Sequence, residues 1–222
     1  YSHRSNFLHT LVTMGVDVLG LSARDTVLPV VPMFHANCWG LALTTPMTGA
    51  TMVMPGAKLD GPSIYELLND YRVTFSAAVP TVWLMLLQHL ETTGAKLPHM
   101  RKVVIGGSAC PRAMTKTFQE VYGVEVCHAW GMTEMSPLGT VCSFKPQHLQ
   151  QTQEERYAVM ARQGRAVFGV DMKVVGEDGR ELPFGAEASG DLHVRGPWII
   201  SRYFKDEGGD PLVDGWFPTG DV

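Results

Sequence analysis

The segment His128-Ala-Trp-Gly-Met-Thr-Glu134 gathers side chains that could hold a nucleotide and a metal ion. Trp130 offers an aromatic face for a base, Thr133 a hydroxyl for a phosphate oxygen, and Glu134 a carboxylate of the kind that Mg²⁺ prefers. The segment follows a short apolar run, and open α/β sheets place ligand loops beyond the carboxyl ends of such strands. The alternative is a polar turn with Trp130 in the core and Glu134 in solvent.

A second segment, Gly106-Gly-Ser-Ala-Cys110, follows the apolar run 102–105. It partly matches the turn that carries the nucleophilic serine of α/β hydrolases, but the second glycine of that pattern is missing. A turn that lets the backbone approach a flat ligand is the simpler interpretation, and a nucleophilic Ser108 is the alternative. The sequence contains no Walker P-loop, GxGxxG, HExxH or EF-hand pattern.

Alternating strands and helices must position these loops through about residue 145. The residues at 63–66 match a capping box, and Pro80 and Gly94 suit the first turn and the end of a strongly apolar helix. Strands that alternate with helices of this length predict βαβ units in an α/β fold with a mostly parallel sheet and flanking helices. The expected strands are residues 26–31, 51–54, 74–79, 102–105 and 124–127, and the expected helices begin near residues 63, 82 and 114.

The pattern changes beyond residue 145. Residues 147–163 are polar and predict a surface helix, and the short alternating runs 167–175, 191–194 and 198–201 follow. Glu177-Asp-Gly179 predicts a tight turn between two strands. We therefore expect residues 1–145 to form an α/β part, and residues 146–222 a smaller antiparallel β section, or partial barrel, of the same domain.

Composition excludes several classes of protein. The 222 residues are 45% hydrophobic and 18% charged, which excludes disorder, collagen and coiled coil. A net charge of −4 without a dense basic run argues against nucleic-acid binding. The longest apolar stretch, residues 77–87, is broken by Pro80 and is too short for a membrane span of roughly 18 residues. The four scattered cysteines, without a CxxC pair, predict reduced thiols in a cytoplasmic protein.

Four segments in order along the chain carry a family resemblance. They resemble motifs of the adenylate-forming superfamily, which comprises acyl-CoA synthetases, adenylation domains and luciferases. Residues 28–37, 79–83 and 106–109 are most similar to the medium- and long-chain fatty-acyl-CoA synthetases. The four motifs are Pro32-Met-Phe-His35, Trp130-Gly-Met-Thr-Glu134, Gly190-Asp-Leu-His-Val-Arg-Gly196 and Thr219-Gly-Asp221.

The resemblance implies that the chain is an internal part of the large N-terminal domain of such a synthetase. It places the phosphate-binding loop just before Tyr1, where the chain begins without Met. It places the hinge and the mobile C-terminal domain with its catalytic lysine just after Asp221. The fragment is therefore expected to be inactive alone.

The resemblance also implies nucleotide contacts. Trp130 stands where the family usually has a tyrosine on adenine, so stacking is kept and a hydroxyl is lost. Thr133 would hold a phosphate oxygen, and Glu134 would hold Mg²⁺. Asp221 would accept hydrogen bonds from the ribose hydroxyls, a turn cap being the alternative. The other residues expected around the nucleotide are Ala36, Gly107, Ser108, Ala109, His128, Ala129, Gly131 and Met132.

The acid would lie next to the nucleotide. His35 would lie beside the carboxylate being activated, a core histidine being the alternative. Trp39 would stand at the mouth of the acyl tunnel, plain packing being the alternative. Together with Thr133 and Glu134, His35 forms the expected catalytic set.

The implied function is an ATP-dependent fatty-acid–CoA ligase. The fatty acid would attack ATP to give acyl-AMP and pyrophosphate, and the thiol of CoA would then displace AMP after a domain rotation. The implied partners are the fatty acid, ATP, Mg²⁺ and CoA, and a homodimer is left open. The alternatives are an adenylating enzyme for an aryl, short-chain or amino acid, and a catalytically silent nucleotide-binding relative.

Overall fold

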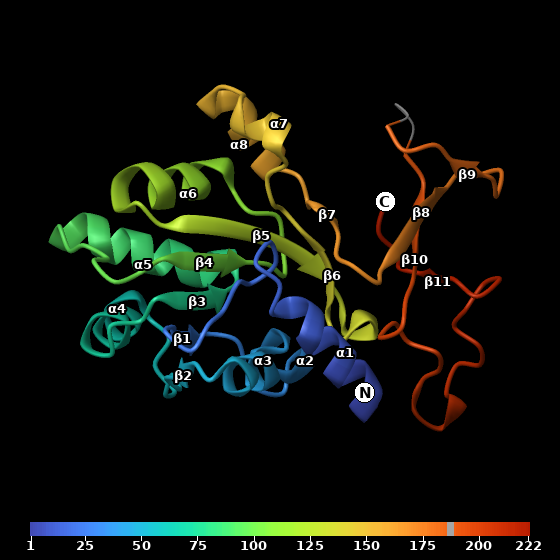
Figure 1. Cartoon of the computed structure of the whole chain (residues 1–222), viewed down its shortest axis with the longest axis horizontal. Helices are drawn as coiled ribbons and strands as arrows, with labels where there is room; N and C mark the ends of the chain where they lie inside the picture. The colour runs from blue at the N-terminus through green and yellow to red at the C-terminus, as the bar shows by residue number, and fades with distance from the viewer. Residues whose placement is uncertain (186–188) are drawn as a thin grey trace.

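The computed structural model describes residues 1–185 and 189–222, which form two sheets (Figure 1). The larger sheet has the strand order β2-β1-β3-β4-β5-β6-β7, and the smaller sheet has the order β11-β10-β8-β9. β1 to β5 pair in parallel, whereas β6 and β7 are antiparallel additions. The larger sheet comprises β1 (Thr26–Pro29), β2 (Thr51–Met52), β3 (Phe75–Ala78), β4 (Lys102–Ile105), β5 (Glu125–Gly131), β6 (Leu138–Val141) and β7 (Arg165–Ala166).

The helices cover both faces of the larger sheet. Neighbouring residues of a strand point to opposite faces, so each strand contributes side chains to both layers of helices. Val103 and Ile105 pack with α4, α5 and α6, while Val104 belongs to the cluster on the other face, where Leu41 of α3 lies. The helices are α1 (His3–Thr13), α2 (Ala36–Trp39), α3 (Leu41–Thr48), α4 (Gly61–Asp70), α5 (Pro80–Thr93), α6 (Arg112–Lys116), α7 (Pro146–Leu149) and α8 (Gln153–Met160), with a π-helical turn, Thr117–Val121, continuing α6.

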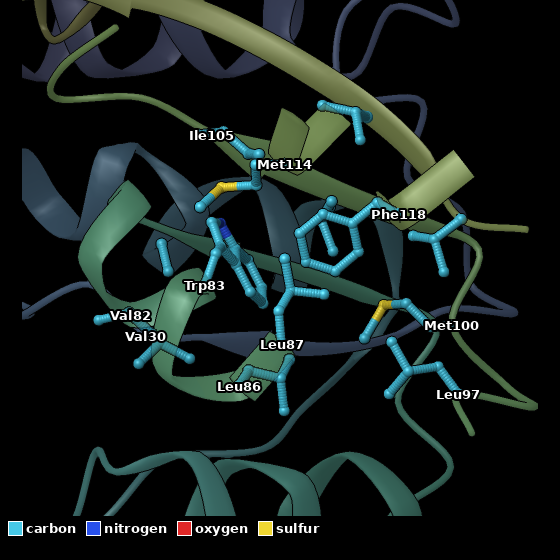
Figure 2. Packing of buried hydrophobic residues seen from close by; sticks show 14 of the residues in the cluster. Val30, Val82, Trp83, Leu86, Leu87, Leu97, Met100, Ile105, Met114 and Phe118 are labelled. Carbon is cyan, nitrogen blue, oxygen red and sulfur yellow. The ribbon is translucent and has the colours of Figure 1, made fainter. Parts of the chain in front are cut away.

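Trp83 lies in the hydrophobic core that α4, α5 and α6 form with one face of the larger sheet (Figure 2). Its side chain is fully buried, and its ring meets that of Phe118 edge to face at 5.5 Å. Its indole N–H donates to the carbonyl oxygen of Val104 at 3.1 Å. The buried indole thus fixes α5 against β4, whose end leads into the glycine segment at residue 106.

The smaller sheet is antiparallel, as predicted. It comprises β8 (Asp171–Val175), β9 (Glu181–Leu182), β10 (Asp191–Arg195) and β11 (Phe217–Pro218). The predicted turn at residues 177–179 lies between β8 and β9, closed by the bond from the Gly179 N–H to the Gly176 carbonyl at 2.9 Å. The division at residue 145 stays a prediction; the pairing of β7 with β6 carries the larger sheet on to Ala166.

Three local expectations are wrong. Helix α4 does not begin with a capping box at Ser63, because Asp60 is the N-cap and accepts the Ser63 N–H at 2.9 Å. The polar stretch 147–163 is not one helix, because Thr152 begins α8 anew with its own capping box. Residues 198–201 are not a strand; Trp198 is buried and donates its indole N–H to the carbonyl of Leu138.

Helix α1 has no counterpart among the expected helices. Its buried residues are His9, Thr10 and Thr13, so its inward face is polar and gives no apolar periodicity. Ser2 caps its start by accepting the Ser5 N–H at 3.0 Å. Thr13 of this polar face also lines a cavity at the carboxyl ends of the parallel strands.

Two predictions from composition bear on the described residues. All four cysteines are free thiols, and three of them are buried, as expected for reduced core residues. Within residues 1–185 and 189–222, no helix combines the length and the apolar character needed to cross a membrane.

Candidate active site

A cavity of about 340 Å³ opens beyond the carboxyl ends of β3, β4 and β5. This is the edge at which parallel α/β sheets place their ligands. The cavity brings together residues from five separate stretches of the chain, which are 13–19, 35–41, 77, 104–107 and 129–138. The predicted site residues that line it are His35, Ala36, Trp39, Gly107, Ala129, Trp130, Gly131, Met132, Thr133 and Glu134.

The wall that carries His35 and Trp39 is a left-handed turn. Residues 36–39 all have positive φ angles, between 47° and 58°, although none of them is glycine. The Cys38 thiol donates to the carbonyl of Val31 at 2.8 Å, and the Asn37 amide donates to Asn6 at 3.3 Å. The indole of Trp39 lies against the backbone of Gly106 and Gly107. The turn therefore aims Trp39 across the cavity at the glycine segment.

Trp130 and Asp221 are joined across 91 residues of sequence. The Trp130 indole N–H donates to Oδ2 of Asp221 at 2.8 Å. The Trp130 ring also packs directly on Gly139: a Cβ atom added to Gly139 would lie 2.6 Å from this ring. Asp221 lies beyond β11 and is attached to the smaller sheet, since its carbonyl accepts the N–H of Leu192 in β10 at 2.9 Å. This contact links the predicted adenine platform to the predicted ribose acceptor.

Thr133 and Glu134 lie on a short 3₁₀ turn, Thr133–Met135, at the cavity mouth. The hydroxyl of Tyr203 donates to Oε1 of Glu134 at 3.0 Å, and the Glu134 carbonyl accepts the Ile200 N–H at 2.7 Å. Burial raises the pKa of Tyr203, and the neighbouring Glu134 carboxylate adds to this effect. The Tyr1 pKa is likewise raised by burial, although a hydrogen bond with Thr133 opposes the shift. Two phenols thus flank the predicted phosphate and metal residues.

The structure places four predicted nucleotide residues outside the cavity lining, which are Ser108, Ala109, His128 and Asp221. Ser108 and Ala109 are exposed on the loop after β4. The His128 side chain is buried on the other side of β5, with Nδ1 3.4 Å from the carbonyl of Met160. Burial lowers the His128 pKa, and its Nε2 has no hydrogen-bond partner among the described residues. A contact of His128 with the purine through its backbone stays a prediction.

His9 of α1 is a site residue that the sequence did not reveal. Its ring is 2% exposed, and Nε2 accepts the backbone N–H of Leu138, a cavity-lining residue, at 3.2 Å. The His9 ring also packs on Gly40, the residue that follows Trp39: a Cβ atom added to Gly40 would lie 2.7 Å from Cε1 of His9. Burial lowers the pKa of His9 to about 4, so the ring is neutral near pH 7. His9 therefore holds two walls of the cavity together.

The arrangement of these residues agrees with a family match. The AMP-binding enzyme family matches residues 1–204 of the chain. The chain belongs to this family. The predicted resemblance to the adenylate-forming superfamily is confirmed.

Curated relatives of this AMP-binding enzyme include two bacterial ligases. A 3-methylmercaptopropionyl-CoA ligase of Ruegeria lacuscaerulensis is 48% identical over 222 residues. A medium-chain-fatty-acid–CoA ligase of Ectopseudomonas oleovorans is 46% identical over 222 residues. Each alignment covers 100% of this chain and 41% of the relative, so the chain spans less than half of their length.

Solved structures share the fold of this AMP-binding enzyme. A long-chain-fatty-acid-CoA ligase from Archaeoglobus fulgidus is 27% identical with a TM-score of 0.81, over 99% of this chain and 45% of that one. The N-terminal domain of FACL13 from Mycobacterium tuberculosis gives a TM-score of 0.83 at 24% identity, over 100% of this chain and 52% of that one. The predicted fold class, a parallel α/β sheet with a separate antiparallel section, is confirmed.

Proposed function

We propose that the full-length protein is an ATP-dependent ligase that joins a fatty acid to CoA through an acyl-adenylate. The observation that carries this proposal is one cavity lined both by His35 and Trp39 and by Trp130, Thr133 and Glu134. The names of the relatives, which are acid–CoA ligases, support the same reaction class. An acid and a nucleotide bound in one cavity would be held as neighbours, which is what adenylation requires.

The nucleotide half of the cavity would bind AMP through two contacts. Trp130 would present its ring to the base, and its bond to Asp221 would keep that carboxylate oriented. A carboxylate is an acceptor without protons, so it suits the two hydroxyls of a ribose. Gly106 and Gly107 line the same cavity, and the absence of a side chain there makes room for the Trp39 indole beside the nucleotide half.

Glu134 fits a single-carboxylate Mg²⁺ site. Among the described residues, no group of three His, Cys, Asp or Glu side chains could hold a metal by itself. Nucleotide sites commonly bind Mg²⁺ through one or two carboxylates together with phosphate oxygens and waters. With ATP bound, Mg²⁺ would neutralise the phosphate charge. Tyr203 would hold the Glu134 carboxylate in place through its hydrogen bond.

The acid half of the cavity would orient the reacting carboxylate. His35 would hold it near the α-phosphorus, and Trp39 would border the acyl chain. The carboxylate oxygen would attack this phosphorus as the bond to the bridging oxygen breaks, so that pyrophosphate leaves. The CoA thiolate would then attack the acyl carbon, and AMP would leave.

Glu134→Gln in the full-length protein tests the proposal. We expect Mg²⁺-dependent release of AMP with fatty acids in the wild type, and a loss of at least about a hundredfold in Glu134→Gln because the charge that holds the metal is gone. Glu177→Gln, on the exposed turn between β8 and β9, is the matched control and should behave as the wild type. Equal rates in the two variants would refute the metal role, and release with no acid would refute the ligase function.

A second candidate is adenylation of a different acid. It is favoured by the 48% identical relative, which is named for a methylmercapto acid rather than a fatty acid. Release of AMP across aryl, amino, short-chain and fatty acids separates the two candidates.

A cytoplasmic location and a homodimer belong to the same proposal. The free thiols support a reducing compartment. Localisation of the tagged protein and sedimentation analysis would test these two points.

A further inference from the structure

Trp198 lies against the turn at residues 133–138, which carries the proposed phosphate and metal residues. Its indole N–H donates to the carbonyl of Leu138 at 3.3 Å. Its own backbone carbonyl accepts the hydroxyl of Ser136 at 2.8 Å. Both hydrogen bonds are buried, where such bonds are stronger than in water. Trp198 therefore holds the second half of this turn at two points.

The side chain of His9 holds the same part of the turn. The Leu138 N–H donates to Nε2 of His9, so both backbone polar groups of Leu138 are bonded to buried side chains. The rings of His9 and Trp198 meet edge to face, with their centroids 6.2 Å apart. On another side, a Cβ atom added to Gly169 would lie 2.9 Å from the Trp198 ring. The indole is thus closely packed and gives Leu138 a fixed support.

The residues that follow Trp198 reach the first half of the turn. The Ile200 N–H donates to the carbonyl of Glu134 at 2.7 Å, and the Tyr203 hydroxyl donates to the Glu134 carboxylate at 3.0 Å. Glu134 and Leu138 line the cavity, whereas Trp198 and Ile200 do not. Trp198 can therefore influence a bound ligand only through the turn.

We propose that Trp198 is a positioning residue, which fixes the turn so that the Glu134 carboxylate lies where Mg²⁺ and ATP need it. This inference rests on the proposed function, because it takes Glu134 as the metal carboxylate. The 3₁₀ turn Thr133–Met135 has only three residues, and the hydrogen bonds of such turns are weak, so contacts from outside determine its place. Mg²⁺ tolerates little departure from octahedral geometry, so a displaced carboxylate would bind it poorly.

Trp198→Phe in the full-length protein tests the proposal. Phenylalanine keeps an aromatic ring and lacks the indole N–H. Without this hydrogen bond the productive placement of the turn is less populated, and the apparent affinity for the metal falls with that population. The measurement is the dissociation constant of ATP by calorimetry, with and without Mg²⁺. We expect the gain in ATP affinity that Mg²⁺ provides to be roughly two- to fivefold smaller in Trp198→Phe than in the wild type.

Trp83→Phe is the matched control. Trp83 is also buried, and its indole N–H also donates to a backbone carbonyl, that of Val104 at 3.1 Å. It belongs to the core cluster on one face of the larger sheet, whereas Leu138 belongs to the other cluster. The two substitutions thus remove the same kind of bond, but Trp83→Phe should keep the wild-type gain from Mg²⁺. Equal gains in the two variants would overturn the positioning role.

Hydrogen exchange of the ligand-free proteins is a second readout, which needs neither the metal nor activity. In Trp198→Phe the backbone amides of residues 132–138 should exchange roughly fivefold faster than in the wild type. In Trp83→Phe the faster exchange should lie in α5 and β4 instead. Ser136→Ala removes the other hydrogen bond to Trp198 and should act in the same direction, so it serves if Trp198→Phe does not fold. Unchanged exchange at residues 132–138 would overturn the proposal.

The outcomes separate this proposal from the ligase function. If the wild type binds ATP more tightly with Mg²⁺ but releases no AMP with any acid, a smaller gain in Trp198→Phe upholds the positioning role while the ligase function fails. If the wild type releases AMP with fatty acids and Trp198→Phe keeps the full gain, the positioning role fails and the ligase function stands. A wild type in which Mg²⁺ adds nothing to ATP affinity would also overturn the positioning role.

Discussion

His9 makes the stability of the protein depend on pH. Its neutral ring accepts the Leu138 N–H through Nε2, 3.2 Å away, and is 2% exposed. A proton on Nε2 would break this hydrogen bond and place a charge in the core, and burial accordingly lowers the pKa of His9 to about 4. In the unfolded chain the ring would titrate at its ordinary value of 6.5.

The size and the sign of the effect follow from these two values. Between pH 6.5 and about pH 4 the unfolded chain binds a proton that the folded protein excludes. Acidification through this window therefore favours unfolding. Each pH unit across it removes about 1.4 kcal/mol, so the contribution lost at about pH 4 is roughly 3 kcal/mol. Above pH 6.5 the full stability is present.

Urea unfolding of the wild type and of His9→Gln measures this contribution. Glutamine has an oxygen that can accept the Leu138 N–H and does not titrate, and every other group is common to both proteins. The free energy of unfolding of the wild type should fall by roughly 3 kcal/mol more than that of His9→Gln between neutral pH and about pH 4. Equal losses in the two proteins would refute the reasoning, as would an NMR titration of the His9 ring near its ordinary pKa.

Three further changes test the packing around the cavity. Gly40→Ala should lower the free energy of urea unfolding by roughly 3 kcal/mol, because residue 40 has a φ of +79° and His9 leaves no space for a methyl group. Gly94→Ala, at a φ of +70° in open space, should lower it by about 1 kcal/mol. Equal losses would contradict the tight contact at Gly40. Trp83→Phe should cost roughly 2 kcal/mol in the same assay, because it removes the hydrogen bond of the indole N–H to Val104 and leaves space in the core, and a change within error would contradict the role of Trp83. Trp130→Phe should weaken AMP binding in calorimetry by roughly tenfold, because Asp221 loses its donor, and unchanged affinity would show that another group orients Asp221.

The parallel sheet could be predicted because its strands carry a strong local signal. Residues 102–105 are the clearest case: the run has two valines and an isoleucine between polar and glycine neighbours, and β4 has the expected bounds. Pro80 and Gly94 likewise set the two ends of α5. The segment 130–134 could be placed at the sheet edge for the same reason, although β5 is longer than the predicted strand 124–127 and includes Trp130 and Gly131.

Other parts of the site could not be predicted, because contacts distant in sequence determine them. The inward face of α1 is polar, and His9 meets its partner Leu138 across 129 residues. The side on which His128 lies depends on how β5 packs against α8. No glycine marks the left-handed turn at residues 36–39. Its shape depends on a thiol and an amide that reach back to Val31 and Asn6.

This left-handed turn also shapes what directed evolution could do with the protein. Ala36, Cys38 and Trp39 each cost roughly 1–2 kcal/mol relative to an ordinary backbone, whereas asparagine tolerates this region better. Selection for heat resistance alone should therefore favour glycine at Ala36, which would relieve strain. The added freedom would loosen the support of Trp39, so variants that gain melting temperature at this turn should lose selectivity for the proposed acid substrate. Screens that aim to raise both properties should leave residues 36–39 fixed and vary the helices on the opposite face of the sheet.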